Sequence, residues 1–308
     1  MKKSLLLSVT LLLSVCLHAQ QTYTFCQRDT TELKLDVYHP VNPRADHACV
    51  LYVFGGGFIS GARNNEHMVN CCTALSDRGF IVVAIDYRLY LKHAKKVPLL
   101  KMHTLFDTAI RYAVEDCSEA IAWLCNHADE LGIDTSRIIL SGSSAGAITV
   151  LQADYWLHNQ HETAKVLPAN FRYAAVISYA GAILSRNGKV KYADGNPAPT
   201  LFYHGTEDRL VNYNQIAFAN IGFFGSNKIV PQFEKFGYPY RIRRMKNFGH
   251  EVAAILPFTM DEIDEFYNEW VKAKHKYQVD ETWYDPDYKP IAWGRTKVSG
   301  LYNKNNKK

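Results

Sequence analysis

Short runs of consecutive apolar residues recur along this 308-residue chain, and longer stretches with helical periodicity separate them. Continuous apolar runs are typical of strands in a parallel sheet whose two faces are both covered. These runs lie at 48–54, 80–85, 137–140, 174–179 and 200–203, and more exposed strands are expected at 33–38 and 240–245. Apolar positions about 3.6 residues apart predict helices over 107–131, 145–158, 227–236 and 251–274. The alternation predicts an α/β fold, a mostly parallel doubly wound sheet with helices on both faces.

Composition excludes several broad classes of protein. Hydrophobic residues make up 47% of the chain and charged residues 21%, which is typical of a globular protein and not of a disordered one. The formal net charge is +5 and the basic residues are scattered, which argues against nucleic-acid binding. No repeat or change in composition marks a second domain. Residues 20–308 are therefore expected to form a single domain with a C-terminal tail from about 277.

The first twenty residues have the pattern of an export signal. Two lysines precede an apolar run over 5–17, and Ala19 offers a cleavage edge. This run is too short for a membrane span, and no other apolar run in the sequence approaches that length. Residues 1–19 are therefore expected to be a signal peptide. The mature protein is expected to be periplasmic or extracellular and to have no membrane span.

Seven cysteines leave six in the mature chain, because Cys16 lies within the expected signal peptide. A faint lipobox precedes Cys16, but Val15 stands where a small residue is expected, so a lipid anchor is the less favoured alternative. An even number of cysteines permits disulfides in an exported chain. Cys117 and Cys125, however, fall on one expected helix about 12 Å apart and are interpreted as small buried residues. The chain has no C-x-x-C pair, so no metal or other cofactor is expected.

A glycine- and serine-rich sequence, GSSAG at 142–146, follows one expected buried strand and precedes an expected helix. The central residue of such a G-x-S-x-G sequence lies on a tight strand-to-helix turn that exposes its hydroxyl. The flanking glycines let neighbouring backbone approach closely, and the N-terminus of the helix favours developing negative charge. Ser144 is therefore the candidate nucleophile.

A serine hydroxyl needs a general base before it can attack a carbonyl carbon. Two later strand ends supply the required groups, namely Asp208 and His250. Asp208 would orient the imidazole of His250, and His250 would take the proton from Ser144. Glu207 is the alternative acid because it is adjacent to Asp208 in the sequence.

Other histidines have less favourable positions for this role. His204 ends an expected strand but precedes the acid, so it is expected to hold the turn. His161 and His275 lie on or beside expected helices, and no acid follows them in the required pattern. His250 therefore remains the candidate base.

Three consecutive glycines, Gly55–Gly57, follow the expected strand at 48–54. Glycines after a strand allow backbone N–H groups to point into a cleft, where they can stabilise an oxyanion. The candidate donors for this oxyanion hole are the N–H groups of Gly56 and Gly57, together with that of Ala145 just after the nucleophile.

Four motifs in this order resemble the α/β-hydrolase superfamily, specifically bacterial carboxylesterases and lipases related to hormone-sensitive lipase and to cholinesterase-type esterases. The motifs are GGGFISG at 55–61, DYRL at 86–89, GSSAG at 142–146, and HGTED at 204–208 followed by GH at 249–250. Many such proteins have a histidine before the three glycines, where this chain has Phe54. Cholinesterase-type esterases have an aromatic residue there, so the resemblance implies an intact oxyanion hole and an α/β-hydrolase fold without a large cap domain.

The resemblance implies a secreted serine carboxylesterase that works through an acyl-serine intermediate. The expected substrate is a small-molecule or polysaccharide-linked ester, such as an acetyl or aromatic ester. Residues 89–103 and 211–226 are expected to wall the substrate pocket. A serine peptidase of the same fold and a catalytically silent binding protein are the alternatives, and the sequence leaves the oligomeric state open.

Overall fold

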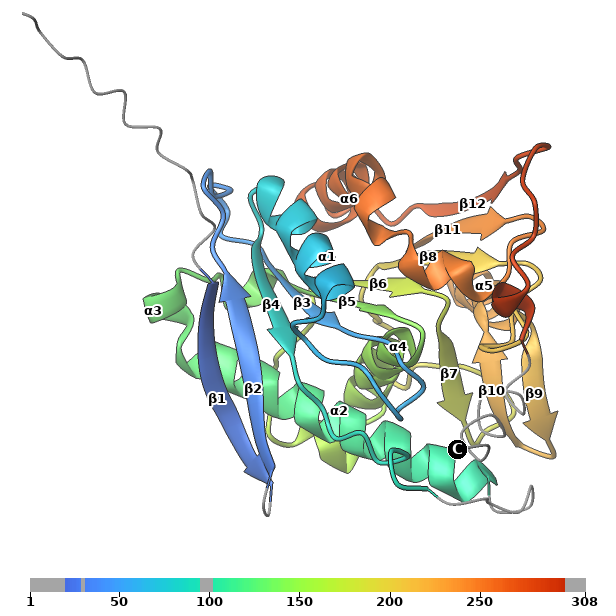
Figure 1. Ribbon diagram of the computed structural model, residues 1–308, viewed down its shortest axis with the longest axis horizontal. Coiled ribbons are helices and arrows are strands. Elements are labelled where there is room, and N and C mark those ends of the chain that lie inside the picture. The colour runs from blue at the N-terminus through green and yellow to red at the C-terminus, as the bar shows by residue number, and fades with distance from the viewer. Residues whose placement is uncertain (1–19, 29–30, 95–101, 297–308) are drawn as a thin grey trace, which may run out of the picture.

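The computed structural model describes residues 20–28, 31–94 and 102–296. Nine strands within these residues form one sheet in the order β1-β2-β4-β3-β5-β6-β8-β11-β12 (Figure 1). Strand β2 is antiparallel to both β1 and β4, and every neighbouring pair from β4 to β12 is parallel. The strands are β1 (Gln20–Arg28), β2 (Thr31–Tyr38), β3 (Cys49–Val53), β4 (Ile81–Ile85), β5 (Ile138–Ser143), β6 (Ala175–Tyr179), β8 (Thr200–Gly205), β11 (Tyr240–Met245) and β12 (Gln278–Trp283).

Helices cover both faces of this sheet (Figure 1). Helix α4 (Ala145–His158) packs on β5 and β6, and α2 (Met102–Asn126) packs against α4. Helix α1 (Glu66–Asp77) lies on the other face against β4, and Arg78 at its end forms ion pairs with Asp261 and Asp264 of α6 (Met260–Phe266). The remaining α-helices are α3 (Ala128–Leu131) and α5 (Ser226–Phe236). The predicted doubly wound α/β architecture is confirmed.

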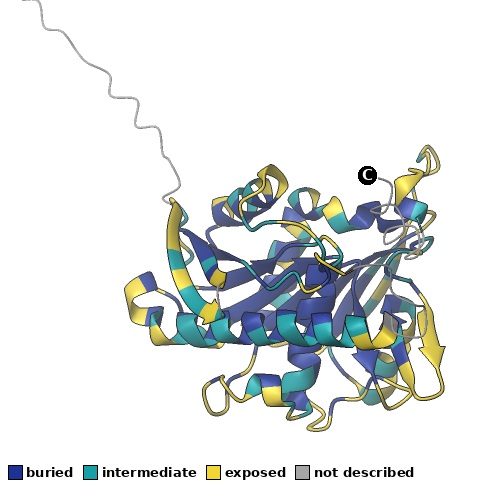
Figure 2. Ribbon diagram, turned by 60° about the horizontal axis from the view of Figure 1, so that its bottom comes forward, coloured by how far each residue is buried: buried dark blue, intermediate teal, exposed yellow. Residues whose placement is uncertain are grey.

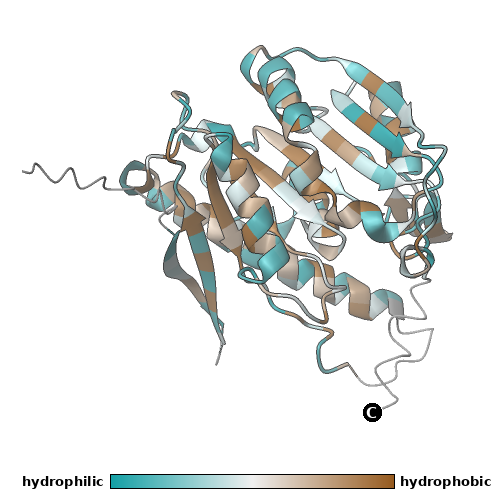
Figure 3. Cartoon of the chain, turned by 45° about the horizontal axis from the view of Figure 1, so that its top comes forward, coloured by the Kyte–Doolittle hydropathy of each residue, from teal (hydrophilic) through white to brown (hydrophobic). Residues whose placement is uncertain are grey.

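The core lies on both faces of the central strands. Strands β3, β4, β5, β6 and β8 are buried along their whole length, as Figure 2 shows in dark blue. Hydrophobic residues, brown in Figure 3, lie in the same central strands. Continuous apolar runs therefore produced doubly covered strands, as predicted. None of the helices in the described part of the chain has both the length and the hydropathy to span a membrane.

The predicted long helix over 251–274 is broken into shorter pieces. A 3₁₀ turn over His250–Ala254 is followed by a second over Leu256–Phe258, by α6, and by a π-helical stretch over Tyr267–Lys272. Proline cannot donate a backbone hydrogen bond and its ring clashes inside a helix, so Pro257 interrupts the helical pattern. Phe258 is correspondingly 86% exposed and does not join the buried stripe expected of it.

The C-terminal tail expected from about residue 277 contains one further strand of the sheet. Residues Gln278–Trp283 form β12, an edge strand parallel to β11. Charges join the two strands: Arg241 and Arg243 contact Glu281, and Arg244 contacts Asp280. The predicted signal peptide 1–19 lies outside the described residues, and β1 begins directly after it at Gln20.

A small antiparallel sheet flanks the carboxyl ends of the parallel strands (Figure 1). Its strands lie in the order β7 (Ala182–Ser185), β10 (Ile221–Gly225) and β9 (Gln215–Phe218). Strands β9 and β10 account for most of the 211–226 segment that was predicted to wall the substrate pocket. The other predicted wall, 89–103, lies partly outside the described residues.

The six cysteines in the described segments are free thiols. Cys117 is fully buried and Cys125 partly buried. Burial raises the pKa of the Cys117 thiol to about 12, which keeps it protonated and unreactive near neutral pH. Both cysteines therefore pack as small apolar side chains.

Candidate active site

Ser144 lies on the turn between β5 and α4, with φ of 53° and ψ of −118°. A positive φ is uncommon for a residue with a side chain and persists only when the surrounding structure enforces it. Here the turn is packed closely against β3, because a Cβ atom on Gly146 would collide with the carbonyl of Val53. The N–H of Ser144 also donates to the carbonyl of Tyr179 at 2.8 Å. The glycine-flanked serine therefore forms the tight turn that its sequence predicted.

Three predicted residues meet at the carboxyl edge of the sheet. His250 Nε2 lies 2.7 Å from Ser144 Oγ, and His250 Nδ1 lies 2.7 Å from Asp208 Oδ2. An ionised carboxylate only accepts hydrogen bonds, so Nδ1–H donates to Asp208 and Nε2 accepts from the serine hydroxyl. His250 and Asp208 are 4% and 3% exposed. This hydrogen-bonded chain places an unprotonated ring nitrogen on the serine hydroxyl.

The parallel sheet explains how these residues meet across long sequence separations. Ser144 follows β5, Asp208 follows β8, and His250 follows β11, and the carboxyl ends of parallel strands lie at one edge of a sheet. The loop before His250 packs closely on the end of β8, because a Cβ on Gly205 would collide with the carbonyls of Phe248 and Gly249. The N–H of Glu207 donates to the Phe248 carbonyl at 2.8 Å.

Asp208 has every expected property of an ionised buried carboxylate. Its Oδ1 accepts from the N–H groups of Leu210 and Val211, at 2.9 and 3.1 Å. Burial alone would raise the pKa of Asp208, but His250 and His204 outweigh burial and lower that pKa to about 2. The carboxylate therefore stays charged throughout the range in which the protein would work.

Ionised Asp208 should make stability depend on pH. Its pKa falls from an ordinary value of 3.8 to about 2 in the folded protein, so it stabilises the native state above about pH 4. That contribution is lost as the pH falls through about 2. We expect the free energy of unfolding of the wild type, relative to Asp208→Asn, to fall by about 2 kcal/mol between pH 5 and pH 2. Urea unfolding of both proteins at pH 5, 4, 3 and 2 measures this trend, and a constant difference would contradict it.

His204 and Glu207 both lie near Asp208 in the sequence, but neither takes its place beside His250. His204 is fully buried: its Nε2 donates to the Val211 carbonyl at 3.0 Å, and its Nδ1 lies 2.8 Å from Ser226 Oγ. His204 thus holds the turn that follows β8, as the sequence indicated. The side chain of Glu207 is 39% exposed and lies 3.9 Å from Arg209. The structure therefore brings Asp208, and not Glu207, to the imidazole.

The remaining candidate histidines have partners of their own. His161 stacks on Trp156 with ring centroids 4.0 Å apart. His275 Nδ1 lies 2.9 Å from a carboxylate oxygen of Glu269. Neither histidine contacts the serine turn.

The glycine loop after β3 lies directly against the serine turn. A Cβ on Gly55 would come 3.1 Å from the Ser144 Cβ and 2.9 Å from the Ser143 carbonyl oxygen. Gly56 and Gly57 both have positive φ, 121° and 65°. Ala145 is the first residue of α4, where backbone N–H groups have no partner within the helix. The glycine loop therefore lies against the serine turn from which α4 begins.

The DYRL motif holds this glycine loop in place. The Tyr87 hydroxyl donates to the Phe54 carbonyl at 3.0 Å, and the two rings stack with centroids 4.4 Å apart. Arg63, just beyond the loop, forms ion pairs with Asp86 and Asp36 at 2.7 and 3.0 Å. Through its carbonyl and its ring, Phe54 thus joins the start of the glycine loop to Tyr87 of the DYRL motif.

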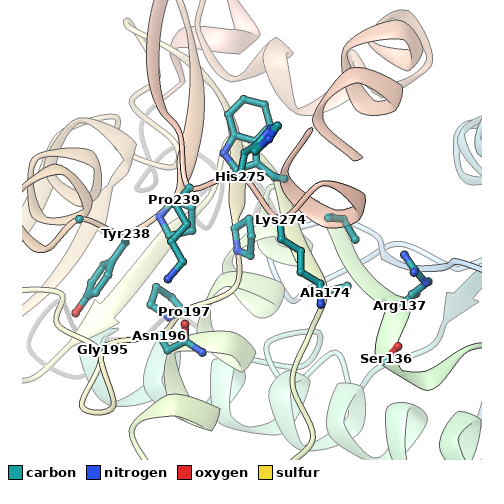
Figure 4. Close-up of a pocket in the computed structure, with 15 residues that line it drawn as sticks. Ser136, Arg137, Ala174, Gly195, Asn196, Pro197, Tyr238, Pro239, Lys274 and His275 are labelled. Carbon is teal, nitrogen blue, oxygen red and sulfur yellow. The ribbon is translucent and has the colours of Figure 1, made fainter. Parts of the chain in front are cut away.

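A cavity of about 320 Å³ lies at the opposite edge of the sheet (Figure 4). Its walls include Arg137, Ala174, Pro199 and Pro239, which directly precede β5, β6, β8 and β11. The amino ends of these strands are remote from Ser144, so this cavity is separate from the candidate site. No group of three or more histidine, cysteine or carboxylate side chains in the described residues is arranged to hold a metal ion.

Comparisons with known proteins agree with this geometry. The BD-FAE family model matches residues 35–183. Lipase 2 of Moraxella sp. (strain TA144) is 36% identical over 101 residues, which are 33% of this chain and 20% of that protein. Ethyl acetate hydrolase of Pseudomonas putida is 31% identical over 121 residues, 39% of this chain and 33% of that protein. Arylesterase of Saccharolobus solfataricus is 33% identical over 115 residues, 37% of this chain and 32% of that protein.

The aligned part thus spans no more than about a third of these relatives. Among solved structures, a thermophilic esterase from Thermogutta terrifontis, Est2-native, aligns with a TM-score of 0.56 at 22% identity, covering 81% of this chain and 92% of that one. This likeness concerns the fold. The sheet order, the serine turn and these comparisons together show that the chain has an α/β-hydrolase fold.

Proposed function

We propose that the protein is a serine carboxylesterase. The observation that carries the proposal is the hydrogen-bonded chain of Ser144, His250 and Asp208, with both links at 2.7 Å. Ser144 is the nucleophile, His250 the general base and acid, and Asp208 the group that fixes the imidazole tautomer. Esterase, hydrolase and lipase names among the relatives support reaction at an ester bond.

Ester hydrolysis then proceeds in two halves. Ser144 Oγ attacks the carbonyl carbon while His250 Nε2 takes its proton, and the carbonyl oxygen becomes an oxyanion. The N–H groups of Gly56, Gly57 and Ala145 donate to this oxyanion. The imidazolium returns the proton to the departing alkoxide, which leaves as an alcohol. A water molecule, deprotonated by His250, then attacks the carbonyl carbon of the acyl-serine. The bond from this carbon to Ser144 Oγ breaks, the imidazolium returns the proton to Oγ, and the acid is released.

The substrates that we propose are small-molecule or polysaccharide-linked esters of short or aromatic acids, met outside the cytoplasm. Relatives named for ethyl acetate and for aryl esters support this range. The export-signal pattern that the sequence predicts at residues 1–19 supports this location.

Hydrolysis of a p-nitrophenyl ester series tests this function. The series runs from acetate to decanoate and includes ferulate. Turnover that is highest on acetate or ferulate is expected, because relatives are named for ethyl acetate and for aryl esters. A matched p-nitroanilide of the best acid should be cleaved far more slowly, and faster cleavage of the anilide would favour a peptidase. No ester or anilide turnover, together with no fluorophosphonate labelling of Ser144, would indicate a silent binding protein.

A further inference from the structure

We propose that Glu251 is a positioning residue, through which the C-terminal segment 284–296 holds the loop that carries His250. The proposal rests on the esterase function described above. It extends the active site to a segment that begins after the last strand of the sheet and has no part in the hydrogen-bonded chain itself. The participating groups are Glu251, Tyr288, Phe248, Gly249 and Gly294.

Glu251 directly follows His250 and points away from the imidazole chain. Its Oε1 accepts the N–H of Gly249 at 2.6 Å and also accepts the hydroxyl of Tyr288. One carboxylate oxygen therefore joins Gly249, the residue before His250, to Tyr288, which lies 37 positions after Glu251 in the chain. Burial and the Glu251 carboxylate raise the pKa of Tyr288 to about 12, so its hydroxyl remains a donor.

Glu251 is only 8% exposed, and its Oε2 is buried without a hydrogen-bond partner. Burying a polar atom without a partner is unfavourable, and native proteins keep few such atoms. An ordinary surface glutamate would turn this oxygen toward water. Here the carboxylate is fixed by its other oxygen, and Gly294 closes over it, because a Cβ on Gly294 would collide with Oε2.

The same segment contacts the loop before His250, residues 247–249, at three further points. The Tyr288 ring stacks on Phe248 with centroids 3.5 Å apart and an interplanar angle of 15°. The Gly294 carbonyl lies where a Cβ on Gly249 would collide with it. The guanidinium of Arg295 donates to the Asn247 carbonyl at 3.2 Å. Each residue from 247 to 249 is therefore held from the C-terminal side.

The loop needs this support because its own backbone is irregular. Asn247 has a φ of 68°, and the loop lies between the end of β11 and a single 3₁₀ turn. The turn after β8 holds its inner side, and the segment 284–296 holds its outer side. Loosening the outer side lets the imidazole move relative to Ser144 Oγ. A displacement of about 1 Å in a catalytic group can lower the rate about 10²-fold.

Two substitutions remove the contact in different ways. Tyr288→Phe deletes the hydroxyl and keeps the stacked ring, and Glu251→Ala deletes the carboxylate. Glu251→Gln retains an oxygen acceptor and is the rescuing variant. Tyr203→Phe is the matched control, because the Tyr203 hydroxyl donates to Glu262 at 2.5 Å in the body of the protein. All four are compared with the wild type on the best p-nitrophenyl ester, at a temperature well below unfolding.

We expect kcat to fall about 10- to 100-fold in Glu251→Ala and about 5- to 20-fold in Tyr288→Phe, with KM within about twofold of the wild type. Glu251→Gln should recover to within about threefold, and Tyr203→Phe should remain within about twofold. Equal kcat in Tyr288→Phe and the wild type, or equal losses in Tyr203→Phe and Tyr288→Phe, would overturn the proposal. If Glu251→Ala does not fold, the comparison of Tyr288→Phe with Tyr203→Phe decides alone.

The wild-type measurement separates this proposal from the function on which it rests. If the wild type cleaves esters and the variants match it, the positioning role is wrong and the esterase stands. If the wild type cleaves no ester, the rate of fluorophosphonate labelling of Ser144 replaces kcat, because that reaction also needs an activated hydroxyl. A wild type that is neither active nor labelled overturns both proposals.

Discussion

Ser144→Ala is expected to lower kcat for ester hydrolysis on the order of 10⁶-fold. The substitution removes the atom that would form the acyl-enzyme, and it leaves His250 Nε2 without the hydroxyl that lies 2.7 Å away. Backbone donors around the turn remain, so slow residual hydrolysis above the rate in water should persist. Initial rates on the best p-nitrophenyl ester, with active-site titration to exclude contaminating esterase, measure the effect.

Ser143→Ala is the matched control for that variant. Ser143 is the last residue of β5, is only 6% exposed, and contributes its side chain next to Tyr52 and not to His250. We expect its kcat within about tenfold of the wild type, since it removes a hydroxyl of the same kind one residue away. If Ser144→Ala kept a rate similar to that of Ser143→Ala, the nucleophile assignment would be wrong.

Asp208→Asn should lower kcat on the order of 10⁴-fold, less than the loss of the serine. An amide at this position can donate to Nδ1, which favours the tautomer with its proton on Nε2. That tautomer cannot accept the Ser144 proton. The amide also lacks the charge that stabilises an imidazolium 2.7 Å away. Because ester binding does not require the imidazolium, KM should change much less than kcat.

Glu207→Gln supplies the comparison, because the two acids are adjacent and only one reaches the histidine. The Glu207 side chain is partly exposed and lies near Arg209, and its backbone N–H, which holds the loop, survives the substitution. We expect kcat within about twofold of the wild type. A larger loss in Glu207→Gln than in Asp208→Asn would reverse the assignment of the acid.

Local pattern and sheet geometry account for what the sequence predicted correctly. The helix over 145–158 has the bounds predicted for it, because small and apolar residues fill every side of a helix packed between the sheet and α2. Ser144, Asp208 and His250 lie far apart in the sequence. Each was predicted because it follows an expected strand, and they meet because parallel strands bring their carboxyl ends together.

Long-range contacts account for what the sequence did not predict. Strand β12 has an exposed, mostly polar sequence, and its charges are explained only by the arginines of β11. The connection from β11 to β12 also passes through α6, on the face covered by α1, which gives this crossover the rare left-handed sense. The contact of Glu251 with Tyr288 has no local signature either, because its partners are 37 positions apart and β12 lies between them in the sequence.

Strand β12 is joined to the sheet differently from the strands at its centre. Its backbone ladder is reinforced by partly exposed charges rather than by apolar packing, and such pairs are weakened by salt and contribute modestly. Local opening therefore should begin at this edge, with amide hydrogens of β12 exchanging before those of β5. Release of β12 carries the segment 284–296 with it. We expect the protein to lose a reactive histidine before it loses its fold, so that heat inactivation precedes melting.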